Sequence, residues 1–413
     1  MTVPGPDQFH AGQFHAGQFH ADQFHADRFD ADRFDADLIA LRRDLHRWPE
    51  LAGAESRTAA LVARRLRAAG LEVSTGVGGH GVVAVLHGAR PGPTVAYRAD
   101  MDAVAADERP GWEFASRVPG AAHLCGHDLH TAIGVGVARL LARSRERVGG
   151  RVVFVFQPAE ETLRGARAML DAGALDQVTP DEVYALHCAP FPVGSFAIMP
   201  GNGLPGLDLG HVDVTGPDAV ATGERLRAAI EGLSTVRRPG TPEEFARMLD
   251  EMRTPDGPAA RFVSAGAQVG AGDDGAVRVR FAVRAWPDDR YPALRDDVRR
   301  LADPAGGRVE FAGPPFPAMV CSPELSHAAA AHLRNLPGVS GVEVLHAPFP
   351  FNGEDFALFL HRVPGAMLYL GVADPERGFN GVPHAPDFGA DERAIGVGVR
   401  AMAGLLLHRL DVL

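Results

Sequence analysis

Short apolar segments alternate with helical patterns through most of this chain, and this alternation restricts its fold more than any other feature. Strand-like segments lie at 82–86, 94–100, 151–157 and 181–187. The strongest helical spacing between them runs over 130–147. Strands that alternate with helices form layered α/β domains, in which a mostly parallel sheet is covered by helices on both faces. The sequence therefore predicts a domain of this class.

The pattern changes between about residues 201 and 316. One strand of this stretch alternates cleanly and places four apolar side chains on one face: Val277, Val279, Phe281 and Val283. A capping box at Thr241 and Glu244 opens a helix. These features predict a small α+β unit, an antiparallel sheet with helices on one side. Because the α/β pattern returns afterwards, we expect this unit to be inserted into the larger domain, which then comprises 37–200 and 317–413.

The N-terminus carries a five-residue repeat, QFHAG changing to RFDAD, over residues 8–37. In a helix or a strand, a five-residue step moves the phenylalanines off a common face. We therefore predict that residues 1–36 form a disordered tail. Four of its histidines could bind a metal ion weakly: His10, His15, His20 and His25.

Composition excludes several functions. Lys and Arg total 41 against 52 Asp and Glu, a net charge of −11, which argues against a nucleic-acid or anionic-membrane partner. All 41 of these basic residues are Arg. The absence of Lys excludes Schiff-base catalysis and a phosphate-loop lysine. The 3 cysteines form no disulfide framework. With no signal-peptide pattern and no apolar stretch of about 18 residues, we expect a soluble cytoplasmic protein.

One familiar motif is rejected on its context. Residues 76–81, GVGGHG, match the dinucleotide-binding fingerprint, whose mechanism requires a helix N-terminus directly after the glycines. A strand follows instead, so we interpret the segment as a glycine-rich hairpin. The chain also contains no Gly-x-Ser-x-Gly nucleophile motif of the serine hydrolases.

Residues that can bind a metal or transfer a proton follow the predicted strands in several places: Asp100, Asp102, Cys125, His127, Glu160, Glu161, His187 and His384. Each alone has an ordinary explanation, such as a packed cysteine beside a surface histidine, or an exposed helix start for the two glutamates. Together they supply thiolate, imidazole and carboxylate donors at the carboxyl ends of strands, where α/β folds build their sites. The sequence therefore predicts a divalent metal site with a spare carboxylate for acid–base chemistry.

The order of the motifs resembles one known group of enzymes. The motifs are DLHRWPEL (44–51), RADMDA (98–103), CGHD (125–128), FQPAEE (156–161), ALH (185–187), GEDF (353–356) and PHAP (383–386). This series resembles the metal-dependent aminoacylase/carboxypeptidase clan, specifically the branch of hippurate hydrolase and the indole-acetyl-amino-acid hydrolases. The resemblance extends from about Asp37 to the C-terminus.

The resemblance implies roles for the candidate residues. One or two divalent ions (Zn, Mn, Co or Ni) would be bound by Cys125, His127, Glu161, His187 and His384. Glu160 would be the general base, and Asp102 would orient the site. The inserted unit would be a lid and dimerisation domain, which implies a homodimer.

The implied reaction is hydrolysis of the amide bond of an N-acyl or N-aroyl amino acid, a small-molecule substrate, to a carboxylic acid and an amino acid. A positive group should hold the free carboxylate of such a substrate. We assign this role to Arg284 on the predicted strand of the inserted unit, although an arginine on such a strand is more often a surface residue.

The chain departs from the pattern of that branch in the inserted unit. A Gly-Gly-His-Ala-Ala-type turn, whose histidine helps to hold the oxyanion, is missing, and His211 lies within a predicted strand instead. Loss of one oxyanion donor commonly lowers the rate roughly 10²–10³-fold. Three interpretations follow: a hydrolase that draws this contact from elsewhere, a hydrolase of low activity or altered substrate, or a metal- or ligand-binding relative without hydrolysis. We favour the first two, because the metal ligands and Glu160 are retained.

Overall fold

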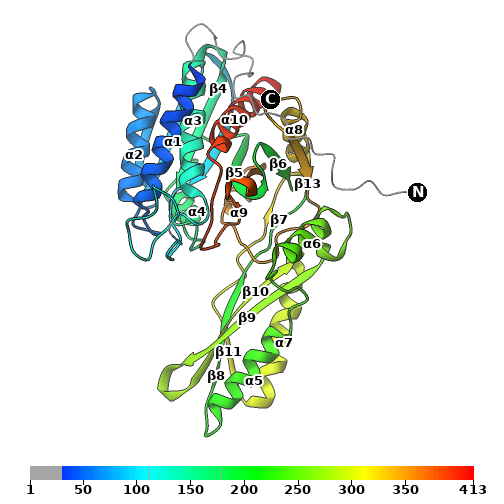
Figure 1. The fold of residues 1–413 in the computed structure, drawn as a ribbon. Coiled ribbons are helices and arrows are strands. Elements are labelled where there is room, and N and C mark those ends of the chain that lie inside the picture. The colour runs from blue at the N-terminus through cyan, green and yellow to red at the C-terminus, as the bar shows by residue number, and fades with distance from the viewer. Residues whose placement is uncertain (1–29, 110, 177) are drawn as a thin grey trace, which may run out of the picture.

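An eight-stranded sheet forms the centre of the larger part of the molecule (Figure 1). The computed structural model describes residues 30–109, 111–176 and 178–413. In spatial order the strands are β1 (Glu72–Val77), β2 (Gly81–His87), β4 (Gly149–Gln157), β3 (Arg90–Asp100), β5 (Glu182–Pro192), β14 (Gly365–Ala373), β6 (Ser195–Ile198) and β13 (Gly341–Val344). Its central strands β4, β3, β5 and β14 run parallel to one another. The antiparallel pairs β1–β2, β2–β4 and β14–β6 lie to either side of them.

One face of this sheet is covered by α3 (His127–Arg143), α8 (Pro323–Leu333) and α10 (Arg393–Val412). Gly134 of α3 lies so close to Phe156 of β4 that a Cβ would come within 2.9 Å of the ring, and a Cβ at Gly398 of α10 would come within 2.8 Å of Ile133 in α3. The helix α1 (Ala31–Arg47) packs outside α3, whereas α2 (Ser56–Ala68) lies beside α3 and contacts β1 and β2 (Figure 1).

Two short helices, α4 (Gly165–Asp171) and α9 (Ala357–Leu360), cover the opposite face. Successive side chains of a strand point to opposite faces, so Gln157 points away from the side of Phe156. The amide of Gln157 donates to Asp355, which lies just before α9, and Asp355 also accepts from the backbone N–H of Ala166 in α4 (2.9 Å). Helices on both faces of a mostly parallel sheet confirm the predicted fold class.

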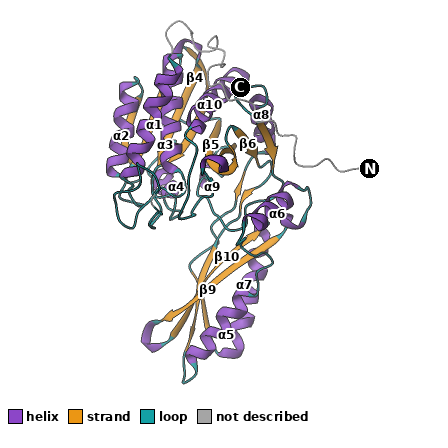
Figure 2. Ribbon diagram, in the orientation of Figure 1, coloured by secondary structure: helices purple, strands orange, loops and turns teal. Residues whose placement is uncertain are grey.

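A second, four-stranded antiparallel sheet lies apart from the first (Figure 2). Its order is β11 (Arg308–Phe311), β8 (Asp208–Val214), β10 (Val277–Trp286) and β9 (Phe262–Ala271). The helices α5 (Ala219–Glu231) and α7 (Tyr291–Ala302) pack on one face, against the alternating apolar side chains of β10. The chain enters this part after β7 (Gly203–Leu204) and leaves it before β12 (Met319–Val320), and these two strands pair with each other.

The helix α6 (Pro242–Arg253) follows α5 in sequence but does not pack in the core of the small sheet. Thr241 caps it as the capping box predicts, since its side chain accepts from the N–H of Glu244. Its buried residues Leu249 and Met252 belong to the hydrophobic core of the larger part. This helix therefore connects the two parts of the molecule.

The predicted disordered tail is wrong for its last six residues. The helix α1 begins at Ala31, and Asp30 caps it by accepting from the N–H of Arg33 (2.9 Å). The last repeat places Phe34 on the face that also carries Leu38, and both side chains are buried. A single phenylalanine in register with the following leucines suffices to extend the helix, whatever the period of the repeat. The remaining repeats, including the four tail histidines, lie outside the described residues.

The glycine-rich segment 76–81 is a hairpin between β1 and β2, as predicted, with Gly76, Gly78 and Gly79 at positive φ. Within the residues that the structure describes, no helix has both the length and the apolar character needed to cross a membrane.

Candidate metal centre

The predicted metal ligands converge at the carboxyl edge of the parallel strands. Cys125 directly precedes the glycine before α3, and His127 is the first residue of that helix. Glu161 follows β4, His384 lies in the loop between β14 and α10, and His187 belongs to β5. The strand β5 continues to Pro192, but its pairing with β3 ends at Ala185, so His187 lies just beyond that segment and is paired only with Tyr369 of β14.

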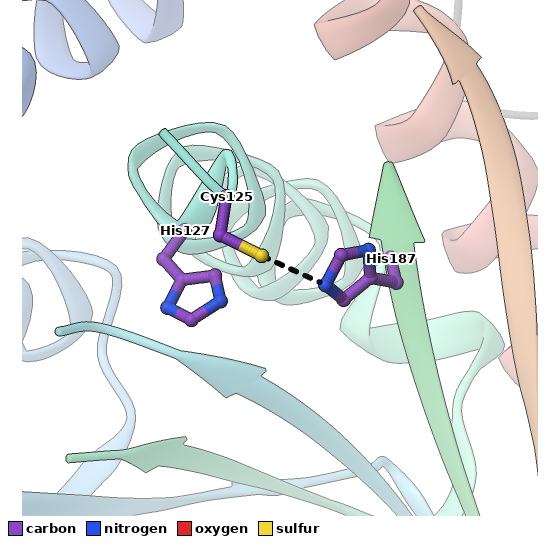
Figure 3. Close-up of side chains that lie close together, drawn as sticks. All are labelled: Cys125, His127 and His187. Atoms are coloured by element: carbon purple, nitrogen blue, oxygen red, sulfur yellow. Dashed lines mark hydrogen bonds between the residues drawn. The ribbon is translucent and has the colours of Figure 1, made fainter. Parts of the chain in front are cut away.

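The donor atoms lie within reach of a shared ion. The Sγ of Cys125 is 3.5 Å from the Nε2 of His187, and Figure 3 shows these side chains and His127 pointing toward one another. The donors of Cys125, His127 and His187 all lie within 4.8 Å of one another, and so do those of Cys125, Glu161 and His384. The structure therefore brings all five predicted ligands together.

The hydrogen bonds around these side chains leave their inner atoms available for a cation. The Nδ1 of His127 lies 2.9 Å from the backbone oxygen of Asp102, and the Nδ1 of His187 lies 2.7 Å from that of Cys188. Among the described residues, the Nε2 of His127 and the Oε1 of Glu161 are buried and have no hydrogen-bond partner. Buried polar atoms are normally satisfied. A divalent ion that accepts thiolate, imidazole and carboxylate donors fits this set.

Negative charge is concentrated here. Burial raises the pKa of Glu161 to about 7, despite the opposing attraction of His127. Burial and the charges of Glu354 and Glu161 raise the pKa of Glu160 well above its usual range. Burial alone would lower the pKa of His127, but Asp100, the hydrogen bond with Asp102 and the charge of Glu161 raise it to about 10. The site thus favours a positive charge at its centre, which a metal cation would supply.

Asp102 holds the turn that carries the two glutamates. Its Oδ1 accepts from the N–H of Glu160 (3.1 Å) and its Oδ2 from the N–H of Glu161 (3.0 Å). Ala159 and Leu163, on either side of this pair, adopt positive φ values of 54° and 55°. Such strain in residues other than glycine is concentrated at functional sites, where the surroundings hold it in place.

A buried network lies under the site, and of its members only Asp100 was among the candidate residues. Arg98 is fully buried and pairs with Asp100 (2.6 Å), Glu354 (3.0 Å) and Asp355 (3.3 Å). The Nδ1 of His130 lies 2.7 Å from Asp100, and its Nε2 accepts from the backbone N–H of Cys188 (2.8 Å). One signal was available, since the apolar strand at 94–100 ends with Arg98 and Asp100 on the same face.

Arg284, the predicted substrate-binding residue, and His211 lie in different environments. Arg284 of β10 lies against Gly353, where a Cβ would come within 2.5 Å of the arginine Nη1. That Nη1 is buried and has no hydrogen-bond partner among the described residues. His211 of β8 lies 3.6 Å from Asp213 and 3.6 Å from Glu310, within the small sheet itself. Its imidazole therefore does not join the metal ligands.

The sequence of this chain is similar to those of known proteins. The pattern that defines peptidase family M20/M25/M40 matches residues 96–408. Thermostable carboxypeptidase 1 of Saccharolobus solfataricus is 30% identical over 394 residues, which cover 89% of this chain and 93% of that protein. N-acetylcysteine deacetylase of Bacillus subtilis is 31% identical over 394 residues, covering 91% of this chain and 97% of that protein.

A solved structure shows the same fold over nearly the whole chain. The YxeP protein of Bacillus subtilis, described as a dinuclear metal-binding peptidase of the M20 family, superposes with a TM-score of 0.73 at 28% identity. The superposition covers 92% of this chain and 100% of that one.

Proposed function

This chain belongs to peptidase family M20/M25/M40 and is a metal-dependent hydrolase of amides, and we propose that its substrates are N-acyl or N-aroyl amino acids. Hydrolysis would release a carboxylic acid and a free amino acid. The observation that carries the proposal is the convergence of five metal-ligating side chains beside Glu160, a buried carboxylate. Relatives named as deacetylases of N-acetylcysteine and N-acetyldiaminopimelate support an N-acyl amino acid as the substrate class.

The metal ligands in this proposal are the five convergent residues: Cys125, His127, Glu161, His187 and His384. They would hold one or two divalent ions, and Zn, Mn, Co and Ni all accept this donor set. A divalent ion held there supplies Lewis-acid chemistry, which acidifies water and polarises a carbonyl group.

Glu160 is the general base of the proposed reaction. It is 6% exposed, and its Oε2 lies 3.8 Å from the Nε2 of His127. In this role its carboxylate removes a proton from the attacking water and later delivers that proton to the leaving amine. Asp102 positions it, because its own carboxylate fixes the backbone of Glu160 and Glu161.

Arg284 binds the free carboxylate of the substrate in this proposal. Its buried Nη1, unsatisfied among the described residues, supports this role, because a guanidinium group pairs well with a carboxylate.

Two further features belong to the proposal. The three cysteines are free and buried, which supports a reducing compartment such as the cytoplasm.

The strand β9 lies at the edge of the small sheet, and a second copy could pair there to form a homodimer through the lid.

One observation favours the alternative, a metal- or ligand-binding relative that does not hydrolyse amides. His211 lies close to Asp213 and Glu310 of the small sheet, so it does not supply the oxyanion contact that the resemblance led us to look for. A substrate panel separates the two functions. Hippurate-like, N-acetyl and indole-acetyl amino acids would be incubated with protein loaded with Zn, Mn, Co or Ni. Release of amino acid supports hydrolysis, whereas bound metal without turnover of any substrate supports the alternative.

Two matched substitutions test the roles of the adjacent glutamates. Glu160→Gln should lower kcat roughly 10²–10⁴-fold, as expected for loss of a general base, while the metal content stays near that of wild type. Glu161→Gln should lower the metal content as well as the activity, because it removes a ligand. Metal analysis of both dialysed proteins, together with kcat, provides the readout. If Glu160→Gln lost its metal and Glu161→Gln kept it, the two roles would be exchanged.

A further inference from the structure

A cavity of about 680 Å³ lies in the small-sheet part of the molecule and reaches Phe351 of the larger part. Three arginines line it, namely Arg237 and Arg238 in the loop after α5 and Arg284 on β10. Its remaining walls include Phe351 and Ala282, and the one carboxylate among the described lining residues, Glu231, is paired with Arg227 (2.5 Å), so cationic groups and apolar surface face the same space. This combination suits an organic anion.

The three arginines differ in their partners. Arg237 pairs with Glu244 of α6. By contrast, no described carboxylate lies within ion-pair distance of Arg238 or Arg284, and the guanidinium of Arg238 lies 5.2 Å from the centre of the Phe351 ring. Arg284 is half-buried and Arg238 is exposed to solvent, and two neighbouring cations repel each other. The cavity therefore has room for negative charge from a ligand.

Arg284 links this cavity to the buried network beside the candidate metal centre, because its Nη1 lies against Gly353 and the next residue, Glu354, pairs with Arg98 (3.0 Å). Burial lowers the pKa of Arg284, Tyr291 and Glu160 act to raise it, and the charge of Arg238 acts to lower it. A ligand held at Arg284 therefore lies next to the loop that carries Glu354.

The loop that carries Arg238 is anchored at both ends. Before it, Ser234 exchanges hydrogen bonds with the backbone of Ala265 in β9. After it, the N–H of Gly240 donates to Glu244 (2.7 Å) at the start of α6. The end of α6 is in turn fixed to the larger part, where the backbone oxygen of Met252 accepts from the N–H of His346 (2.7 Å). These contacts hold Arg238 in place at the cavity.

We propose that Arg238 is a specificity-determining residue which, together with Arg284, selects substrates that carry two carboxylates on the amino-acid half, such as N-acyl glutamate or N-acyl aspartate. Arg284 binds the α-carboxylate and Arg238 binds the side-chain carboxylate, each through charge-assisted hydrogen bonds. This inference rests on the proposed function, because it assigns a substrate class to the same site.

The kinetic test compares N-acetylglutamate with its isostere N-acetylglutamine, which keeps the α-carboxylate but has a neutral side chain. Wild type should prefer the glutamate substrate in kcat/KM by roughly 10–100-fold, mainly through KM, as expected for one charge-assisted interaction. Arg238→Gln should remove this preference and leave turnover of N-acetylglutamine within about 2-fold of wild type. Arg237→Gln is the matched control, since its charge is already paired, and should keep the preference. Equal losses on both substrates in Arg238→Gln would overturn the proposal.

A binding test separates failure of this inference from failure of the proposed function. Calorimetric titration of metal-loaded Glu160→Gln with the two ligands measures selectivity without turnover. Tighter binding of N-acetylglutamate than of N-acetylglutamine, lost when Arg238→Gln is added to Glu160→Gln, supports the inference. This holds even if wild type hydrolyses neither compound. Absence of hydrolysis would overturn only the proposed function. Equal binding of both ligands overturns the inference. A preference for N-succinylalanine over N-butyrylalanine, without one for the glutamate ligand, also overturns it, because the second acid would then lie on the acyl half.

Discussion

The carboxylate of Asp102 shows how much one side chain contributes to this site. It uses both oxygens to accept from the N–H groups of Glu160 and Glu161, and its backbone oxygen lies 2.9 Å from the Nδ1 of His127. Three proposed functional side chains therefore depend on the position of one residue that would not itself touch the metal. Groups that orient ligands in this way commonly change metal affinity about 10–100-fold when they are replaced.

Asp102→Asn tests this dependence. An amide has only one oxygen, so either Glu160 or Glu161 would present its N–H to the amide NH₂ group, which cannot accept it. We expect metal affinity to fall about 10–100-fold. A competition titration with a chelator measures the affinity, and kcat at saturating metal measures the activity.

Asp181→Asn is the matched control for this substitution. Asp181 also accepts from a backbone N–H, that of Thr94 (2.8 Å), but it lies near the opposite end of the parallel strands. It should leave metal affinity unchanged. If the two variants lost metal equally, Asp102 would have only a general structural role.

At the scale of elements, the sequence best predicts the strands that are buried on both faces of the sheet. The segments 94–100 and 151–157 are apolar runs because central parallel strands are covered by helices on both faces, and both were predicted. The strand β9, rich in Gly and Ala, was missed, because an edge strand with small residues shows little alternation. The capping box at Thr241 predicted α6, but no local pattern indicates which core that helix joins.

The site was predictable to the extent that its residues form local motifs. Cys125 and His127 stand two positions apart, and Glu160 and Glu161 are adjacent, so each pair can be recognised along the chain. The contact between Arg98 and Glu354 joins residues 256 positions apart. Only the folded sheet brings such groups together, and a buried arginine is not an expected core residue.

The position of α6 leads to a prediction about stability. Met252 is fully buried in the core of the larger part, although its helix lies in sequence between α5 and β9 of the small part. Met252→Ala should lower the free energy of unfolding by about 2–5 kcal/mol, the usual cost of such a truncation in a core. Denaturant titration of the metal-loaded protein measures it.

Arg247→Ala is the control on the same helix. Arg247 is exposed, and its loss should change the free energy of unfolding by no more than about 0.5 kcal/mol. If Met252→Ala cost no more than this control, α6 would not be anchored in the larger core.

At the scale of the whole molecule, stability should depend on a histidine far from the proposed chemistry. His332 of α8 stacks on His408 of α10, with ring centres 4.8 Å apart and planes 14° apart. Burial and the charge of His408 lower the pKa of His332 to about 4. Its usual value of about 6.5 applies in the unfolded chain. Between these two values the unfolded state binds a proton that the folded state does not, so stability falls as pH falls through this range.

His332→Phe should reduce this acid sensitivity, because it keeps a ring against His408 but cannot bind a proton. Between pH 7.5 and pH 5 the wild type should lose about 1 kcal/mol more stability than the variant, a value that allows for the partial exposure of the imidazole. Denaturant titrations of both metal-loaded proteins at the two pH values give this difference, and the shared contribution of the metal-site histidines cancels from it. His327→Phe, at an exposed position of the same helix, is the control and should retain the wild-type dependence. Equal pH dependence in wild type and His332→Phe would show that the stacked pair does not couple folding to protonation.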